Sequence, residues 1–242
     1  MSVIEILVSA LLILLGASLG VLAWRASRAG RRLLRDRARK VRELDPGPAK
    51  LTGELRATEP LTALDGSRAV AVRGSLRCVD KSDAEDFRSL DVPYTGCSPV
   101  EVVDETGTCA LEVGPMLILG PTRSHVFEGK DFEARHPALW SGVLGLPAGA
   151  KVEQVFAEEI VVPDGVTGIA SGKASLAEGL PRRFKLGGDE GSPLVLSCWD
   201  EKTVLRVLLM PAVRVAWLAL LSLLVAGLAL AIPLFVEARW GL

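Results

Sequence analysis

Asparagine is absent from the sequence, histidine occurs twice and cysteine four times. Without asparagine there is no acceptor for N-glycosylation. Structural zinc sites normally take their ligands in closely spaced pairs, and no CxxC pair occurs among Cys78, Cys97, Cys109 and Cys198. We therefore expect no zinc finger, and we predict no catalytic, cofactor-binding or metal-ligating residue.

The charges are unevenly distributed, although the totals nearly cancel at 28 Lys and Arg against 29 Asp and Glu. Residues 43–214 contain 18 basic and 26 acidic residues, a net charge of −8. The stretch before them holds nine basic residues, here called the basic collar: Arg25, Arg28, Arg31, Arg32, Arg35, Arg37, Arg39, Lys40 and Arg42. An acidic domain with a basic collar is a poor general nucleic-acid binder, so we expect no nucleic-acid partner.

The chain has a long apolar segment near each end. Ile6–Trp24 is 19 residues without a charge, and Val215–Val236 is 22. At about 1.5 Å per residue, each is long enough to cross a hydrocarbon core of about 30 Å. A cleaved signal peptide and a buried core helix are the alternatives for the first segment, but Glu5 precedes it and no Lys or Arg does. We predict transmembrane helices over 4–24 and 215–236, and the bilayer as a partner.

The flanking charges predict the orientation. The basic collar follows the first segment directly, and basic residues near a span stay on the cytoplasmic side. We therefore expect an integral protein, of the bacterial inner membrane, with a cytoplasmic central domain and both termini outside. The basic collar could also bind anionic headgroups. Gly16 and Gly20 form a GxxxG spacing that could bring two helices together, although such spacing is also common by chance.

Between the apolar segments the pattern changes from helical to β. Residues 25–45 lack helix breakers over most of their length and predict a basic helical stalk, ended by Asp45-Pro46-Gly47-Pro48. Short β-type runs then fill 50–200 and predict a small β barrel or sandwich. A helix over 201–214 is expected to lead into the second span, with a short tail at 237–242.

Several local features are predicted inside the β region. Turns predict one hairpin over Pro99–Val113 and a second over Lys151–Lys173, and Gly74 is a candidate bulge in a strand over Ala69–Val79. Ala134–Leu146 is predicted to be an internal helix or loop anchored in the core by Trp140. Polar loops are expected over Asp80–Asp91 and Ala177–Gly191.

Candidate chemical groups are sparse. His125 and His136 lie in no nucleophile motif, so exposed or half-buried histidines are the expected interpretation. The neighbouring pair Glu158 and Glu159 is interpreted as a solvated edge rather than as an acid/base pair.

The layout resembles the GIDE-type proteins, the mitochondrial-type membrane E3 ubiquitin ligases and their prokaryotic relatives. The segments VEVVDETGTCALEV, EQVFAEEIVVPDGVTGIASGKA and PLVLSCWDEKTVLRVL carry the resemblance, in this order before a second span. It covers about Leu51 to the end of that span, and it implies a "beside a membrane" domain between two spans. Ligase members carry a zinc-binding RING after the second span, whereas 237–242 contain no Cys or His.

The favoured function is therefore an interaction or sensing module next to the membrane, with a protein partner or self-association. The alternatives are the E3 ubiquitin transferase that the resemblance implies, an undetected hydrolase, and a membrane scaffold that oligomerises through its spans.

Overall fold

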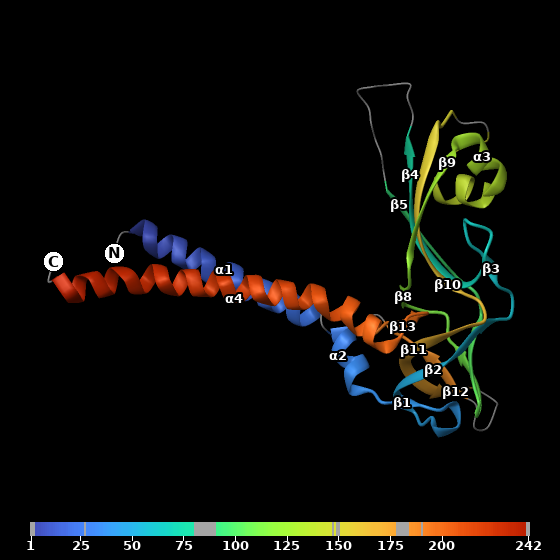
Figure 1. The fold of residues 1–242 in the computed structure, drawn as a ribbon, viewed down its shortest axis with the longest axis horizontal. Coiled ribbons are helices and arrows are strands. Elements are labelled where there is room, and N and C mark those ends of the chain that lie inside the picture. The colour runs from blue at the N-terminus through green and yellow to red at the C-terminus, as the bar shows by residue number, and fades with distance from the viewer. Residues whose placement is uncertain are drawn as a thin grey trace. The chain divides into compact units, whose positions relative to one another are not determined.

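The computed structural model describes residues 3–26, 28–79, 91–146, 148, 151–177, 184–189 and 191–240. The chain divides into two compact units (Figure 1). Met1–Arg35 and Lys202–Leu242 form the helical unit, and Asp36–Glu201 forms the β unit. The predicted mainly β chain with a long apolar C-terminal helix is confirmed.

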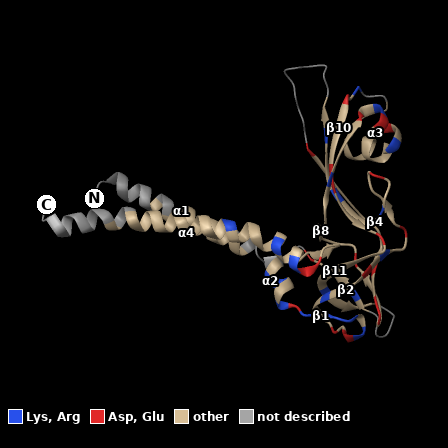
Figure 2. Ribbon diagram, in the orientation of Figure 1, with Lys and Arg blue, Asp and Glu red and all other residues tan. Residues whose placement is uncertain are grey.

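The helical unit contains α1 (Val3–Ala26), α2 (Arg28–Arg35) and nearly all of α4 (Glu201–Trp240). α4 is one continuous helix over the predicted 201–214 and 215–236. Among the described residues, its stretch Glu201–Leu228 alone is long and apolar enough to cross a membrane. Trp217 and many of its leucines are exposed, and no charged residue follows Arg214 within that stretch (Figure 2). α1 forms a helix over the predicted 4–24, and its crossing of a membrane stays a prediction.

Five strands of the β unit close into a barrel. The ring runs in the order β2 (Gly47–Ala57), β6 (Val100–Asp104), β7 (Gly107–Leu111), β12 (Phe184–Gly187) and β11 (Val166–Leu176), and β11 pairs again with β2. Neighbours are antiparallel except β7 and β12, which are parallel. A five-stranded Greek-key barrel is the architecture of the OB-fold, which by itself assigns no function.

Alternation along the barrel strands places their apolar side chains inside. Leu55 of β2 lies opposite Val102 of β6, which lies opposite Cys109 of β7, and all three are buried in one core cluster. Three short strands extend the sheet beyond the ring: β1 (Ala38–Arg39), β13 (Leu194–Ser197) and β8 (Met116–Leu119).

The β unit contains a second sheet besides the barrel (Figure 1). It contains β9 (Thr122–Glu128), β10 (Gln154–Pro163) and β4 (Arg68–Val79) in this order, with β3 (Leu61–Thr62) and β5 (Val92–Cys97) along the far edge of β4. β3, β4 and β5 lie between two barrel strands in the sequence, and so do β9 and β10. Two insertions into the barrel therefore build this sheet together.

One face of the second sheet is covered by α3 (Gly129–Arg135) and a π-helical turn, η2 (Leu139–Val143). Phe132 and Trp140 from this cover are almost fully buried against Leu76, Val155 and Ala157 of the sheet. The core position predicted for Trp140 is confirmed, while the helix before it begins at Gly129 rather than at Ala134.

The predicted hairpin over Lys151–Lys173 is wrong. Its two strands exist as β10 and β11, but β10 belongs to the second sheet and β11 to the barrel. The turn between them is held by both sheets: Gly165 N–H donates to the Leu55 carbonyl, and Asp164 N–H donates to the Arg68 carbonyl. The Pro163–Gly165 turn therefore carries the chain from the second sheet to the barrel, and β10 and β11 do not pair with each other as the prediction had them. The hairpin over Pro99–Val113 is confirmed as β6 and β7.

The predicted helical stalk over 25–45 is also wrong in its second half. α2 ends at Arg35, and the next residues join the β unit as β1 and a 3₁₀ turn, η1 (Val41–Glu43). β1 pairs with β2, Val41 N–H donates to Asp104 at 2.8 Å, and Arg42 N–H donates to Thr106 at 3.1 Å. These contacts with the β6–β7 turn outweigh the helix propensity of the segment.

The two predicted loops lie partly outside the described residues, at 80–90, 178–183 and 190. Within the second loop, Phe184–Gly187 is not a loop but β12, the strand that closes the barrel.

Candidate functional site

A row of four residues crosses the covered face of the second sheet. In strand order it contains Arg123 of β9, Glu159 of β10, Gly74 of β4 and Tyr94 of β5, each opposite the next. Polar residues in such a row are unusual, because the neighbouring positions Val155, Ala157 and Val161 of β10 are buried and apolar.

Glu159 is the centre of this row, and only 2% of its surface is exposed. Its Oε1 accepts a hydrogen bond from the Tyr94 hydroxyl at 2.9 Å, and its Oε2 accepts one from the Leu64 N–H at 3.0 Å. The interpretation of Glu158 and Glu159 as a solvated edge is therefore wrong for Glu159 and holds only for exposed Glu158. The alternation of β10 was the missed signal, because it places Glu159 in register with the buried Val155, Ala157 and Val161.

Gly74 makes the Tyr94–Glu159 hydrogen bond sterically possible. A Cβ on Gly74 would lie 2.7 Å from Tyr94 Cε1 and 2.4 Å from the Glu158 carbonyl oxygen. The ring of Tyr94 therefore occupies the space that any side chain at position 74 would need. The bulge predicted at Gly74 is absent, since the register with β10 is regular there and shifts only between Val162 and Pro163.

Burial and the neighbouring carboxylate keep Tyr94 protonated. Loss of solvent, followed by the charge and hydrogen bond of Glu159, raises the pKa of the phenol far above its ordinary value of 10.0. At neutral pH the hydroxyl is a hydrogen-bond donor and not a nucleophile or base.

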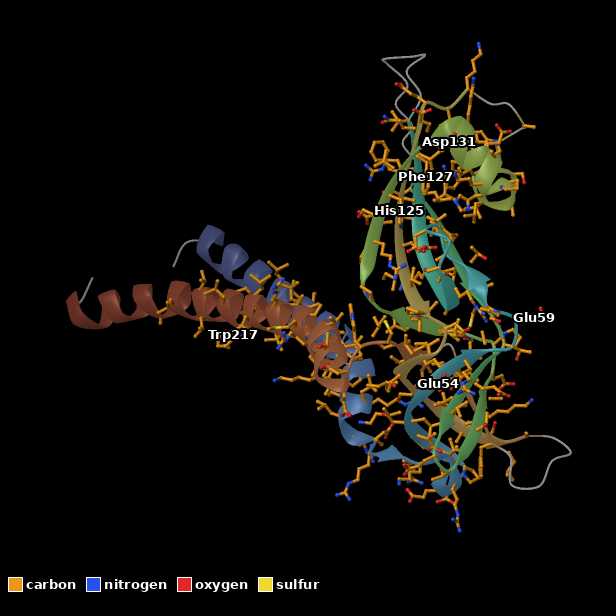
Figure 3. The ribbon with its side chains drawn as sticks, turned by 45° about the vertical axis from the view of Figure 1, so that its right-hand side comes forward. Glu54, Glu59, His125, Phe127, Asp131 and Trp217 are labelled. Carbon is orange, nitrogen blue, oxygen red and sulfur yellow. The ribbon has the colours of Figure 1, made fainter. Side chains whose placement is uncertain are left out.

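His136 lies at the end of α3 beside this row, in contact with a ring cluster. Its ring centroid lies 5.1 Å from that of Phe132 and 5.7 Å from that of Phe127, which neighbours His125 on β9 (Figure 3). Burial, and secondly the charge of Arg135, lower the pKa of His136 below its ordinary 6.5, which favours the neutral ring. The His136 Nε2 atom is buried and has no hydrogen-bond partner among the described residues.

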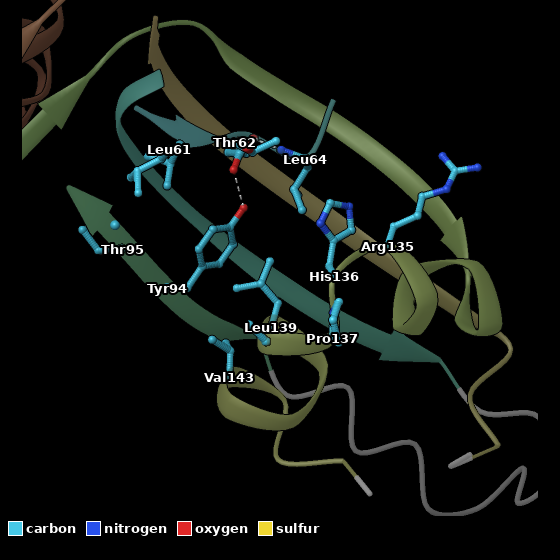
Figure 4. A pocket seen from close by; sticks show the side chains of 14 residues that line it. Leu61, Thr62, Leu64, Tyr94, Thr95, Arg135, His136, Pro137, Leu139 and Val143 are labelled. Carbon is cyan, nitrogen blue, oxygen red and sulfur yellow. Dashed lines mark hydrogen bonds between the residues drawn. The ribbon is translucent and has the colours of Figure 1, made fainter. Parts of the chain in front are cut away.

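Glu159, Tyr94 and His136 line a pocket of about 350 Å³, which we call the Glu159 pocket (Figure 4). It is open on one side, and its lining is predominantly apolar: Leu61, Thr62, Leu64, Val72, Tyr94, Thr95, Gly96, Arg135, His136, Pro137, Ala138, Leu139, Val143 and Glu159. A concave apolar site with a few convergent polar groups is the usual form of a small-ligand pocket.

The cysteines do not contribute to this pocket. Cys109 is buried in the barrel, where loss of solvent raises the pKa of its thiol to about 11, so it is not a reactive thiolate. Within the described part of the chain, no group of three or more His, Cys, Asp and Glu side chains could hold a metal ion.

The residues predicted for helix packing lie in the helical unit. A Cβ on Gly16 would lie 2.7 Å from Ser222 Oγ of α4, so the bare backbone of Gly16 allows this close contact. A Cβ on Gly20 would meet nothing within 4 Å. The glycine contact in the structure is thus between two helices of one chain, and dimerisation through Gly16 and Gly20 stays a prediction.

The basic collar is divided between the two units. Arg25, Arg28, Arg31, Arg32 and Arg35 belong to the helical unit, while Arg37, Arg39, Lys40 and Arg42 belong to the β unit. The Arg31 guanidinium lies 5.3 Å from the Trp24 ring centroid. Lys40 forms an ion pair with Glu105, and Arg39 forms one with Asp45 at 3.3 Å.

Comparison with known proteins does not assign the chain to a family. No family model matches the chain, and neither a curated protein nor a solved structure matches it. Function must therefore be argued from the pocket and the helices themselves.

Proposed function

We propose that this is an integral membrane protein whose β unit is a non-catalytic binding module, which senses a ligand in the Glu159 pocket. One observation carries the proposal: an almost fully buried carboxylate lies at an apolar cleft that is large enough for a small molecule. Burying a carboxylate is costly, and the fold orients it with a backbone N–H and the Tyr94 hydroxyl. A site that is built at this cost, with the Tyr94 hydroxyl held as a protonated donor, suits recognition better than chemistry.

The membrane part of the proposal rests on the helices. α4 exposes a continuous set of large apolar side chains, and exposing such a surface to water is unfavourable, whereas lipid would solvate it. The exposed residues are Trp217, Leu218, Leu220, Leu221, Leu223, Leu224, Val225 and Leu228. We propose that α1 also crosses the membrane, as the first of two spans. The basic collar favours a cytoplasmic β unit, with both termini on the other side of a bacterial-type inner membrane.

Membership of the GIDE-type family is part of the proposal and not its basis. The order of spans and strands supports it, as does the β6–β7 hairpin with its DETG turn. Under this proposal the chain shares the membrane-apposed domain of that family, and binding rather than ubiquitin transfer is its role.

The proposal is tested by screening ligands against the full-length protein in lipid nanodiscs. A library of fluorinated fragments, followed by ¹⁹F NMR, should give hits that compete with one another for a single site. Ala138→Trp places a large side chain at the exposed rim of the pocket and should weaken the hits at least tenfold. Ala134→Trp is the matched control, because Ala134 is also exposed but does not line the pocket.

Hits that survive Ala138→Trp, or a screen that finds no hit, would contradict a binding role for this pocket. Far-UV circular dichroism of both tryptophan variants shows whether either change alters the fold.

A further inference from the structure

Glu159 has hydrogen-bonding capacity that the protein does not use. An ionised carboxylate offers about four lone-pair positions, and the Tyr94 hydroxyl and the Leu64 N–H occupy two of them. Among the described residues, no Lys or Arg side chain forms an ion pair with Glu159. A buried carboxylate that accepts only two hydrogen bonds and has no basic partner is complementary to a cationic ligand, because charges that are buried in proteins are normally paired.

Two basic residues beside the pocket, Arg123 and Arg135, bind other groups. Arg123 lies opposite Glu159 in the sheet, but its guanidinium binds Asp65 and the Ser67 hydroxyl. Arg135 reaches the pocket from α3, where its side chain is 66% exposed and faces Asp131 at 4.0 Å. Neither guanidinium forms an ion pair with the Glu159 carboxylate, so a cationic ligand would not have to displace one.

Two further groups suit a cation that carries N–H donors. The aromatic ring of Tyr94 forms part of the wall, and ring faces attract cations that come within about 6 Å. His136 Nε2 has no hydrogen-bond partner in the described part of the chain, and it can accept one when the neutral ring carries its proton on Nδ1. Around them, Leu61, Val72 and Leu139 provide an apolar wall for the rest of the ligand.

We infer that the Glu159 pocket binds a small organic ammonium, a primary amine on an apolar body, with its charged group at the Glu159 carboxylate. This inference rests on the proposed binding function and adds the chemical class of the ligand. The volume of about 350 Å³ accommodates a single substituted ring or a branched alkyl chain.

Isothermal titration calorimetry of the full-length protein in nanodiscs tests the charge. The probes are 2-phenylethylammonium and its neutral counterpart 2-phenylethanol, each also titrated into empty nanodiscs to subtract partitioning into lipid. The ammonium should bind the protein at least tenfold more tightly than the alcohol. Because this comparison uses the unaltered protein, it does not depend on the folding of any variant.

Two glutamine variants then locate the interaction. Glu159→Gln should weaken ammonium binding at least tenfold and leave alcohol binding within about threefold. Glu158→Gln is the matched control, since Glu158 is the neighbouring residue on the opposite, exposed face of the same strand. It should change neither affinity by more than about twofold.

Equal affinities for the two probes, or ammonium binding that survives Glu159→Gln, would overturn the inference. If neutral or anionic fragments bind at the pocket and the ammonium does not, the ligand class is wrong and the binding function stands. If no fragment and neither probe binds, the proposed function fails together with the inference.

Discussion

Lys50 Nζ lies 2.7 Å from Glu201 Oε1, and this ion pair joins β2 of the barrel to the first residue of α4. Lys50 is only 3% exposed, whereas the Glu201 side chain is 44% exposed. The two residues are far apart in sequence, so the pair fixes the C-terminal end of the β unit to its first long strand.

Loss of Glu201 should therefore cost more than loss of an ordinary surface acid. Glu201→Ala leaves the ammonium of Lys50 buried without this partner, and we expect the free energy of unfolding to fall by about 1–3 kcal/mol. Lys50→Met removes the buried charge itself and should cost less than Glu201→Ala. Urea unfolding of the full-length protein, followed by circular dichroism, measures both.

Glu54 supplies the control for this comparison. It pairs with Arg56 at 2.8 Å on the surface, where both side chains are exposed by more than a third. Water screens such an exposed pair, so Glu54→Ala should have a small effect compared with Glu201→Ala. If it destabilises the protein as much as Glu201→Ala does, burial of Lys50 is not the reason for the larger cost.

Gly74→Ala tests the steric basis of the Glu159 pocket. The added methyl group overlaps the Tyr94 ring and the Glu158 carbonyl oxygen, and such overpacking costs about 1–3 kcal/mol. Gly142→Ala is the matched control, because a Cβ there meets nothing within 4 Å. Thermal unfolding should show a lower Tm for Gly74→Ala alone; equal values for the two variants would mean that the Tyr94 ring can move aside at little cost.

Sequence reasoning succeeded where the determining contacts are local. The β6–β7 hairpin follows from an Asp104–Gly107 turn in which Asp104 accepts N–H hydrogen bonds from Thr106 and Gly107. The long apolar run of α4 needs no distant partner to be recognised. Both features are encoded within a few residues of one another.

It failed where a residue's partner is distant in the sequence. The Pro163–Gly165 turn resembles a hairpin turn, but Gly165 binds the carbonyl of Leu55, more than 100 residues earlier. Helix propensity over 36–43 could not indicate that Asp104 and Thr106 would bind this backbone. The Glu159 pocket was missed for the same reason, since β4, β5, β10 and the segment after α3 all contribute to it.

Tyr94 can be titrated directly because it is the only tyrosine in the chain. Its pKa is raised, first by burial and then by Glu159, so its absorbance near 295 nm should not change as the pH passes through 10. Glu159→Gln removes the negative charge and should lower the pKa of Tyr94, while burial still holds it above 10. Ordinary ionisation at pH 10 in the folded protein would show that the ring is solvated, and circular dichroism at each pH excludes unfolding as the cause.

The orientation in the membrane is tested with single cysteines in a variant whose four natural cysteines are replaced by serine. The labelling sites are Lys151, an exposed position of the β unit, and Gly241 near the C-terminal end. In intact cells, a membrane-impermeant maleimide should label Gly241→Cys and spare Lys151→Cys, because the basic collar keeps the β unit in the cytoplasm. Lysis should make both positions reactive, which controls for burial. Labelling of Lys151→Cys in intact cells would mean that nine basic residues had been translocated, and the proposed cytoplasmic location of the binding module would be wrong.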